Sequence, residues 1–145
     1  MARSHSLLRQ VLTAQYFAVL NTVGEGSPHS NLVSFAVTDD LRSLVFVTRR
    51  DTRKYTNMQE NHGVSLLVDN RSNKPEDISE ATAIEVVGTA REDTDSSSDL
   101  KAFLIDRHPQ IRRFVEAAET AIMVVRVKEY IISGFDETER VVMSE

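Results

Sequence analysis

Four cations lie within six consecutive positions of a chain whose formal net charge is −5: Arg49, Arg50, Arg53 and Lys54. Residues 45–48 (Val-Phe-Val-Thr) have the β-branched and aromatic composition of a strand. Residues 53–61 contain good helix formers and no Gly or Pro, and Asp51 or Thr52 can cap a helix that begins at residue 53. The sequence therefore predicts a strand, a short turn and a helix, with the cations gathered around the start of the helix.

Cations at a helix N-terminus need an explanation, because the helix dipole is positive there and disfavours each of them by about 0.3–1 kcal/mol. The first backbone N–H groups also lack partners, so this end of a helix suits an anion such as a phosphate. For Arg53 and Lys54, inside the first turn, the pattern favours ligand binding. For Arg49 and Arg50 two interpretations remain open, namely ligand binding or a solvated turn in which Asp51 pairs with one of them.

Side chains that could carry out catalysis by themselves are not recognisable in the sequence. The histidines, at positions 5, 29, 62 and 108, do not have metal-ligand spacing, and the chain contains no cysteine. No GxSxG, P-loop or GxGxxG motif occurs, and no arrangement of nucleophile and base stands out. We therefore expect no metal and assign no catalytic residue. An anion site without catalytic side chains suits an enzyme whose cofactor supplies the chemistry.

The composition indicates a single globular domain that spans residues 1–145. No apolar run approaches the roughly 20 residues of a membrane span, and the N-terminus lacks the pattern of a signal peptide. Mild acidity and few aromatic residues argue against a nucleic-acid binder, since the basic cluster is local. The lack of cysteine fits a reducing compartment. We therefore expect a cytoplasmic protein that binds neither nucleic acid nor membrane.

Hydrophobic periodicity predicts short strands joined by tight turns. We expect strands at residues 16–23, 29–38, 43–48, 64–69, 83–89, 121–127 and 130–135, with a possible edge strand at 140–143. Residues 24–28 read as a turn and residues 71–79 as a loop. A helix capped by Ser4 is expected near the N-terminus, and residues 100–118 read as helical with a break at His108-Pro109. This order predicts a mainly β fold, an antiparallel barrel with flanking helices.

Three segments in the first half of the chain carry a family resemblance. They read FAVLNTVGEGSPHSNLVSF (residues 17–35), LVFVTRRDTRKYTNM (residues 44–58) and NHGVSLLVD (residues 61–69). In order, spacing and residue type they resemble the pyridoxamine 5′-phosphate oxidase-like, FMN-binding split-barrel family. The resemblance is close over residues 16–69, loose over residues 83–91 and weak in the C-terminal third.

The resemblance implies a split β-barrel, an antiparallel Greek key of about six strands. It further implies a homodimer with FMN at the subunit interface, acting on a small-molecule substrate. Arg53 and Lys54 match the pair that holds the FMN phosphate. Val47 and Thr48, at the end of the third strand, are expected to contact the cofactor as well, and Thr48 matches a hydroxyl residue near that phosphate. Four residues match the second-strand segment beneath the flavin ring and ribityl chain: Asn31, Leu32, Val33 and Ser34.

Several positions depart from the oxidase pattern. Asn31 stands where the oxidases carry a phosphate-binding Arg, for which Arg49 or Arg50 could compensate. Ser34 replaces a substrate-contacting Lys, and Ala83 replaces an FMN-contacting Gln. The C-terminal Arg and His contacts have no counterpart, and the lack of any His after residue 108 counts against haem.

We therefore expect an FMN-binding oxidoreductase of the pyridoxamine phosphate oxidase-like superfamily that acts on a different small molecule. A non-catalytic flavin-binding or sensor protein, and a deazaflavin-dependent reductase, are the alternatives.

The apolar residues of the first helix and of strand 121–127 favour a homodimer, because they offer more hydrophobic surface than one small barrel covers. The alternative is that helical residues 100–118 cover this surface within one protomer. Phe135 is a candidate contribution of the partner chain to the pocket near Ser34, and its alternative role is in the core.

Overall fold

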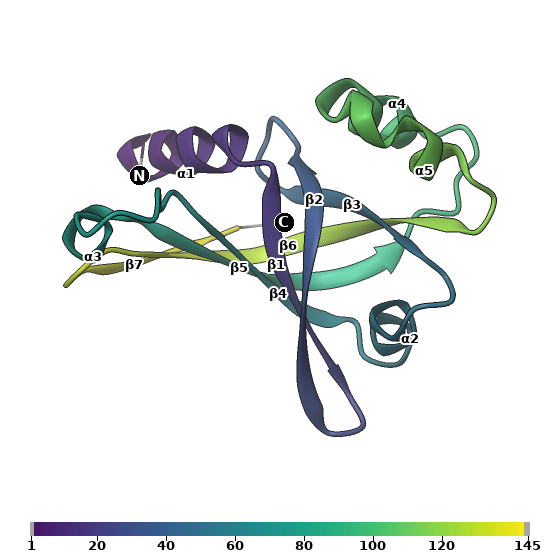
Figure 1. The fold of residues 1–145 in the computed structure, drawn as a ribbon, viewed down its shortest axis with the longest axis horizontal. Coiled ribbons are helices and arrows are strands. Elements are labelled where there is room, and N and C mark those ends of the chain that lie inside the picture. The colour runs from purple at the N-terminus through teal and green to yellow at the C-terminus, as the bar shows by residue number, and fades with distance from the viewer. Residues whose placement is uncertain (1, 144–145) are drawn as a thin grey trace.

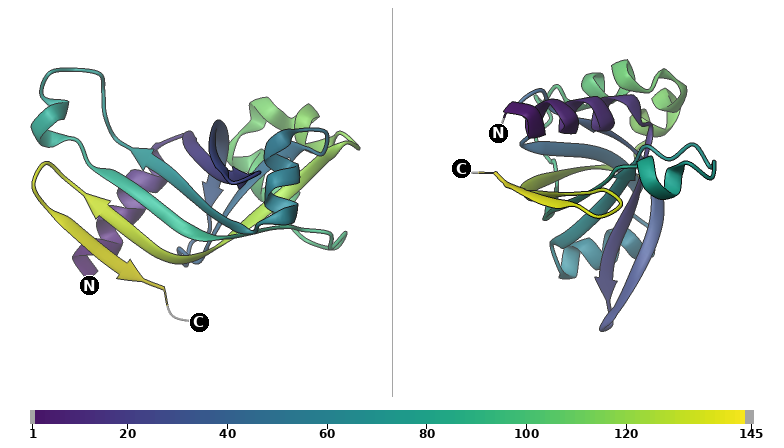
Figure 2. Two further views of the ribbon diagram at one scale, coloured as in Figure 1. Left: turned by 90° about the horizontal axis from the view of Figure 1, so that it is seen from below. Right: turned by 90° about the vertical axis from the view of Figure 1, so that its left-hand side faces the viewer.

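The strands form one antiparallel sheet that closes into a barrel. The computed structural model describes residues 2–143, and within them the strand order is β3-β2-β1-β4-β5-β6-β7, with β3 also paired to β6. The strands are β1 (Phe17–Gly24), β2 (Ser27–Val37), β3 (Ser43–Arg49), β4 (Gly63–Asp69), β5 (Ala83–Glu92), β6 (Thr120–Ser133) and β7 (Thr138–Val142). The β3–β6 pairing closes a six-stranded antiparallel barrel, and β7 lies beside the second half of β6 (Figure 2). The predicted mainly β split barrel is confirmed.

Helices flank the barrel on two sides. They are α1 (Ala2–Ala14), α2 (Arg53–Glu60), α3 (Asp77–Glu80), α4 (Leu100–Arg107), the 3₁₀ turn η1 (Pro109–Ile111) and α5 (Arg112–Glu116). Figure 1 shows α1, α4 and α5 along one side, and α2 lies near the opposite side, where it packs against β1. None of the helices within residues 2–143 has the length and apolar character needed to cross a bilayer.

The β1–β2 hairpin projects beyond the barrel next to α2. Its turn consists of Glu25 and Gly26 alone, both with positive φ (52° and 76°), as in the primed two-residue turns that match strand twist. The turn is therefore shorter than the predicted 24–28. Gly24 ends β1 where the strand touches α2, and a Cβ there would lie 2.1 Å from Asn57 Oδ1. The glycine thus permits the close approach of β1 and α2.

Three local predictions differ from the structure. Strands 121–127 and 130–135 form a single strand, β6, because Lys128 is accommodated as a bulge opposite the Val87/Gly88 step instead of starting a turn. Ser4 lies inside α1 rather than at its cap, and its hydroxyl donates to the Glu139 carboxylate. The loop at 71–79 runs into the short helix α3, whose Asp77 carboxylate accepts three backbone N–H bonds from residues 72–74.

The hydrophobic core has two parts. The main cluster fills the barrel and is covered by α1, whose Leu8 and Leu12 are fully buried. The second cluster joins α4 and α5 to the outer face of β2, β3 and β6: Ala36, Val45, Val47, Leu104, Ile105, Val115 and Ile122. The helical segment therefore covers this face of β6 within one protomer. The surface that the sequence analysis assigned to a dimer interface is already buried, so that argument for a dimer is wrong.

Candidate functional site

A hollow of about 240 Å³ lies where β2 and β3 meet the start of α2. Its apolar wall combines strand and helix residues: Phe17, Leu32, Val33, Val47, Ile111 and Phe114. Its polar lining residues are Ser34, which pairs with Phe17, and four residues that form a polar end around the start of α2: Thr48, Arg49, Thr52 and Lys54. A ligand with one flat apolar part and one anionic part matches this division.

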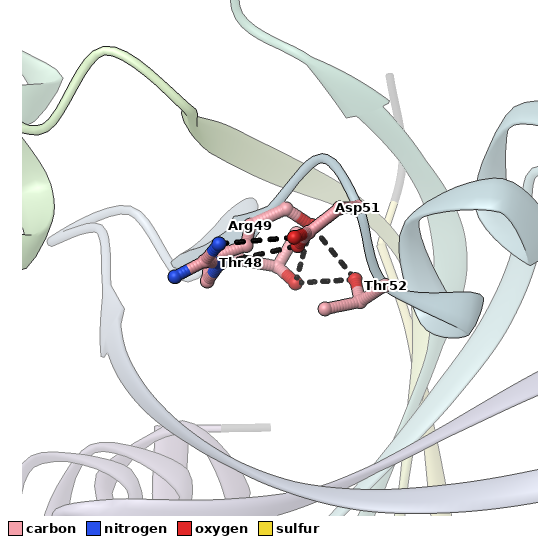
Figure 3. Close-up of polar contacts among 4 residues, drawn as sticks. All are labelled: Thr48, Arg49, Asp51 and Thr52. Atoms are coloured by element: carbon pink, nitrogen blue, oxygen red, sulfur yellow. Dashed lines mark hydrogen bonds and ion pairs between the residues drawn. The ribbon is translucent and has the colours of Figure 1, made fainter.

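Two threonine hydroxyls shape the polar end, as Figure 3 shows. Thr48 Oγ1 lies 3.1 Å from Thr52 Oγ1, and Thr52 Oγ1 donates to the Arg49 carbonyl across 2.7 Å. The Tyr55 N–H donates to Thr52 Oγ1 across 3.4 Å, so Thr52, and not Asp51, is the N-cap of α2. The cap places the first turn of α2, with backbone N–H groups that have no partner inside the helix, at the edge of the hollow.

Lys54 is the cation of the first turn that reaches this hollow. Its side chain is half-buried, and within residues 2–143 its ammonium makes no hydrogen bond or ion pair. A partly desolvated ammonium next to a positive helix end is unfavourable unless an anion compensates it. The position of Lys54 thus supports an anion-binding role for this end of the hollow.

Arg49 and Arg50 point in different directions. Arg49 makes a bidentate ion pair with Asp51 (3.1 and 2.9 Å), which raises the pKa of the guanidinium and lowers that of the carboxyl. Both side chains of this pair are mostly exposed, and Arg49 also lines the hollow. Arg50 instead donates to Glu92 (2.6 Å) and to the Ala118 carbonyl (2.8 Å). Pairing with Asp51 is therefore correct for Arg49, and Arg50 is not placed to compensate for Asn31.

Arg53 lines a different hollow from Lys54. Its Nη1 is 3.1 Å from His29 Nδ1, and it lines a second hollow beneath the β1–β2 hairpin with Asn57 and Glu60. Asn31 is exposed and lines neither hollow. Six of the eight predicted cofactor-binding residues are brought together at the first hollow: Leu32, Val33, Ser34, Val47, Thr48 and Lys54. Their role toward a cofactor stays a prediction.

Several residues of this hollow are not predicted from the sequence to belong to the site. The sequence predicts Thr52 only as a possible helix cap. The hydroxyl of an N-cap residue nevertheless lies close to an anion bound at the same helix end. Phe17 lies in the segment that carries the family resemblance, but no pattern marked it as a binding residue. Ile111 and Phe114 have helical spacing, which indicates a buried face without revealing which surface it covers.

A charged network fixes α2 against β3 and β5. Tyr55 OH donates to Glu92 Oε1 across 2.5 Å, while Arg50 donates to Glu92 Oε2. Burial acts to raise the pKa of Glu92, but the hydrogen bonds from Arg50 and Tyr55 outweigh it, and the pKa lies below its ordinary value. The carboxylate therefore stays ionised and holds both partners at neutral pH.

No group of three or more His, Asp or Glu side chains within residues 2–143 is arranged to hold a metal ion. The donors at the hollow are hydroxyl, ammonium, guanidinium and backbone N–H groups, which are complementary to an anion.

The sequence matches the family model described as pyridoxamine 5′-phosphate oxidase over residues 5–132. The chain belongs to the pyridoxamine 5′-phosphate oxidase family. A comparison with curated protein sequences gave no match.

Solved structures share the fold. A heme binding protein from Mycobacterium smegmatis aligns with a TM-score of 0.82 and 14% identity, over 92% of this chain and 55% of that one. General Stress Protein 26 from Bacillus anthracis str. Sterne aligns with a TM-score of 0.75 and 22% identity, over 96% and 99% of the two chains. An FAD-binding protein from Mesorhizobium loti aligns with a TM-score of 0.71 and 17% identity, over 88% and 91%. The chain thus spans about half the length of the heme binding protein.

Proposed function

We propose that the protein binds FMN at the hollow beside α2 and is a flavin-dependent oxidoreductase for a small molecule other than pyridoxamine 5′-phosphate. The observation that carries the proposal is Lys54, a half-buried cation without a partner among residues 2–143, set at a capped helix start next to an apolar wall. Membership of the family and the name of the Mesorhizobium loti neighbour, an FAD-binding protein, support the flavin assignment.

The residues of the hollow fit the two ends of FMN. Lys54, the Thr48 and Thr52 hydroxyls and the first N–H groups of α2 would hold the phosphate, by charge-assisted hydrogen bonds and the helix dipole. Phe17, Leu32 and other residues of the apolar wall would contact the ring. Bound FMN would supply hydride transfer at its ring. The chain's own contribution is to bind and orient the cofactor and to keep water from its apolar part.

We infer that two copies of the chain together form the complete site, as a homodimer. A hollow of about 240 Å³ is smaller than the roughly 300–1,000 Å³ typical of ligand pockets. Phe17 and Leu32 line the hollow, and their side chains are 56% and 66% exposed. Val19 of β1 pairs with both Leu32 and Leu67, so Leu67 lies on the same face of the sheet, where it is 40% exposed. A second copy seated on this outer face of β1, β2 and β4 would bury these side chains and complete the site. We place this dimer in the cytoplasm.

The substrate differs from that of the vitamin-processing oxidases. Ser34 lines the hollow with a short neutral hydroxyl, so it offers no charge to a substrate phosphate. Leaving a dianion unpaired as it loses water costs several kcal/mol, and each 1.4 kcal/mol is about tenfold in affinity. We expect negligible oxidation of pyridoxamine or pyridoxine phosphate, even with flavin bound. Turnover of pyridoxine phosphate above about 10⁴ M⁻¹s⁻¹ would contradict this.

Ligand binding and turnover test the proposal separately. The absorption spectrum and mass of the co-purified ligand, followed by titration with FMN and riboflavin, identify the cofactor. FMN should bind more tightly than riboflavin, and equal affinities would remove the phosphate assignment. A deazaflavin in the purified protein would replace FMN in the proposal.

Anaerobic reduction by a nicotinamide donor, followed by a screen of oxidants, then distinguishes an enzyme from a flavin carrier that shows no turnover.

A further inference from the structure

We propose a second anion site, at the opposite end of β3 from the FMN hollow, that binds a small organic phosphate. Three cations, Arg42, Arg126 and Lys128, line a hollow of about 330 Å³ there, and no carboxylate is among its lining residues. The remaining lining residues are Thr89, Val127, Val142 and Met143. This hollow shares no residue with the one beside α2.

The backbone holds these cations in place. Arg126 of β6 is in register with Ser43 of β3 and Thr89 of β5 at once. The Val127 N–H donates to the Arg42 carbonyl across 2.9 Å, which fixes the start of β3 against β6. Arg126 and Thr89 therefore lie on paired strands, and Arg42 lies in the bend directly before β3.

The β-bulge in β6 adds the third cation. Val87 pairs with Glu129 and the next residue, Gly88, pairs with Val127. Lys128 is therefore the extra, unpaired residue of the bulge, two positions after Arg126 in the same strand. Gly88 is required for this arrangement, since a Cβ there would lie 2.2 Å from the Arg126 carbonyl oxygen. The carbonyl of Lys128 accepts the Met143 N–H across 2.8 Å, which places the end of β7 at the wall of the hollow.

Two of the three cations of this hollow have no charged partner among residues 2–143. Arg126 and Lys128 make no hydrogen bond or ion pair from their side chains to residues 2–143. The adjacent carboxylate, Glu129, is instead bonded to Arg140 at 3.1 Å through Nε. Arg42 differs from them, because its charge acts on Asp40, which also accepts the Arg42 backbone N–H and lies outside the lining. Like charges held close together repel one another, so a bound anion would stabilise this region.

The lining defines the chemistry of the ligand. The guanidinium of Arg126 offers forked donors that match a phosphate, and the ammonium of Lys128 adds a point charge. Thr89 adds a hydroxyl, and Arg42 adds positive charge at the wall of the hollow. Three cations favour a dianion over a single carboxylate. Val127, Val142 and Met143 form an apolar wall beside them. A phosphate monoester with a small apolar group therefore fits better than inorganic phosphate alone.

Residue-resolved NMR titration tests this site directly. Phenyl phosphate should shift the backbone amides of Thr89, Arg126 and Lys128 in the ¹⁵N-labelled protein, and inorganic phosphate should do so more weakly. Arg126→Ala with Lys128→Ala should weaken this binding by at least about 30-fold, because two charge-assisted contacts are lost. The exchanged variant, Arg126→Lys with Lys128→Arg, should retain binding and shows that the fold tolerates changes at both positions.

Matched controls separate this site from general electrostatics and from the FMN hollow. Lys74→Ala with Arg113→Ala removes the same charge from positions outside the hollow and should leave the titration unchanged. Lys54→Ala should also leave it unchanged, so the outcome does not depend on the proposed flavin site.

Shifts that survive the loss of Arg126 and Lys128, or that vanish equally in the Lys74 and Arg113 control, would overturn the proposal. The proposal would also be overturned if a DNA duplex shifts these amide signals and phenyl phosphate does not.

Discussion

Tyr55 and Glu92 are joined by a hydrogen bond of 2.5 Å that ties the first turn of α2 to the end of β5. The contact raises the pKa of the Tyr55 hydroxyl, because the nearby carboxylate disfavours the phenolate. Glu92 also accepts from Arg50, which follows β3. The direction of α2, and with it the placement of Thr52 and Lys54, therefore depends on a carboxylate from a distant part of the sequence.

Removing the Tyr55 hydroxyl should loosen the proposed phosphate site. Tyr55→Phe leaves one oxygen of Glu92 without its partner, and such a loss typically costs about 1–3 kcal/mol. We expect a lower free energy of unfolding and several-fold weaker FMN binding, measured by urea denaturation and flavin titration. Tyr16→Phe is the control, because the contacts of Tyr16 to Arg107 and His108 are made by its ring. Equal FMN affinity in both variants would show that the Tyr55 contact does not position α2.

Glu92 should make part of the stability depend on pH. Its pKa in the folded protein lies below the ordinary value of 4.5, so its charge stabilises the fold at pH values above 4.5. This contribution is lost as the pH falls below 4.5 through the folded pKa. The difference in free energy of unfolding between wild type and Glu92→Gln should be present at pH 7 and shrink under acid conditions. A difference that does not change between pH 7 and pH 3.5 would contradict the assignment.

Lys54 and Arg53 should contribute unequally to FMN binding, although they are adjacent. Lys54 lines the hollow beside β3, whereas Arg53 lies beside His29 in a different hollow. Lys54→Ala should weaken FMN by roughly 10- to 150-fold, the loss of one charge-assisted hydrogen bond, and Arg53→Ala by much less. Riboflavin, which has no phosphate, should bind both variants like wild type. Isothermal titration of the two flavins checks this, and a larger effect at Arg53 would show that its side chain turns to the phosphate.

Gly24 should be sensitive to the smallest substitution. A Cβ at this position would lie 2.1 Å from Asn57 Oδ1, and the Asn57 amide donates to Thr22 Oγ1 across 3.1 Å in a buried site. Gly24→Ala should therefore displace α2 or break this bond, at a cost of about 1–3 kcal/mol. Gly134→Ala is the matched control, because no atom lies within 4 Å of its added Cβ. Thermal unfolding of both variants measures the difference, and equal midpoints would contradict the close packing at Gly24.

The sequence by itself determined the local structure around the site. A strand that ends within one residue of Thr48, a cap at Asp51 or Thr52 and a helix beginning at Arg53 follow from propensity and capping, which act between neighbouring residues. The same segment carries the family resemblance, so the barrel could be predicted as well.

Only the tertiary structure decided how these residues are used. Consecutive helical residues point about 100° apart, and the packing of α2 against β1 places Lys54 at the hollow beside β3 and Arg53 at the hollow of the β1–β2 hairpin. The bulge in β6 was not predicted either, because whether Lys128 starts a turn or leaves the ladder depends on pairing with Gly88. Ile111 and Phe114 reach the hollow through the docking of α4 and α5 on β3 and β6. Such contacts depend on segments far apart in sequence, which periodicity within one segment does not specify.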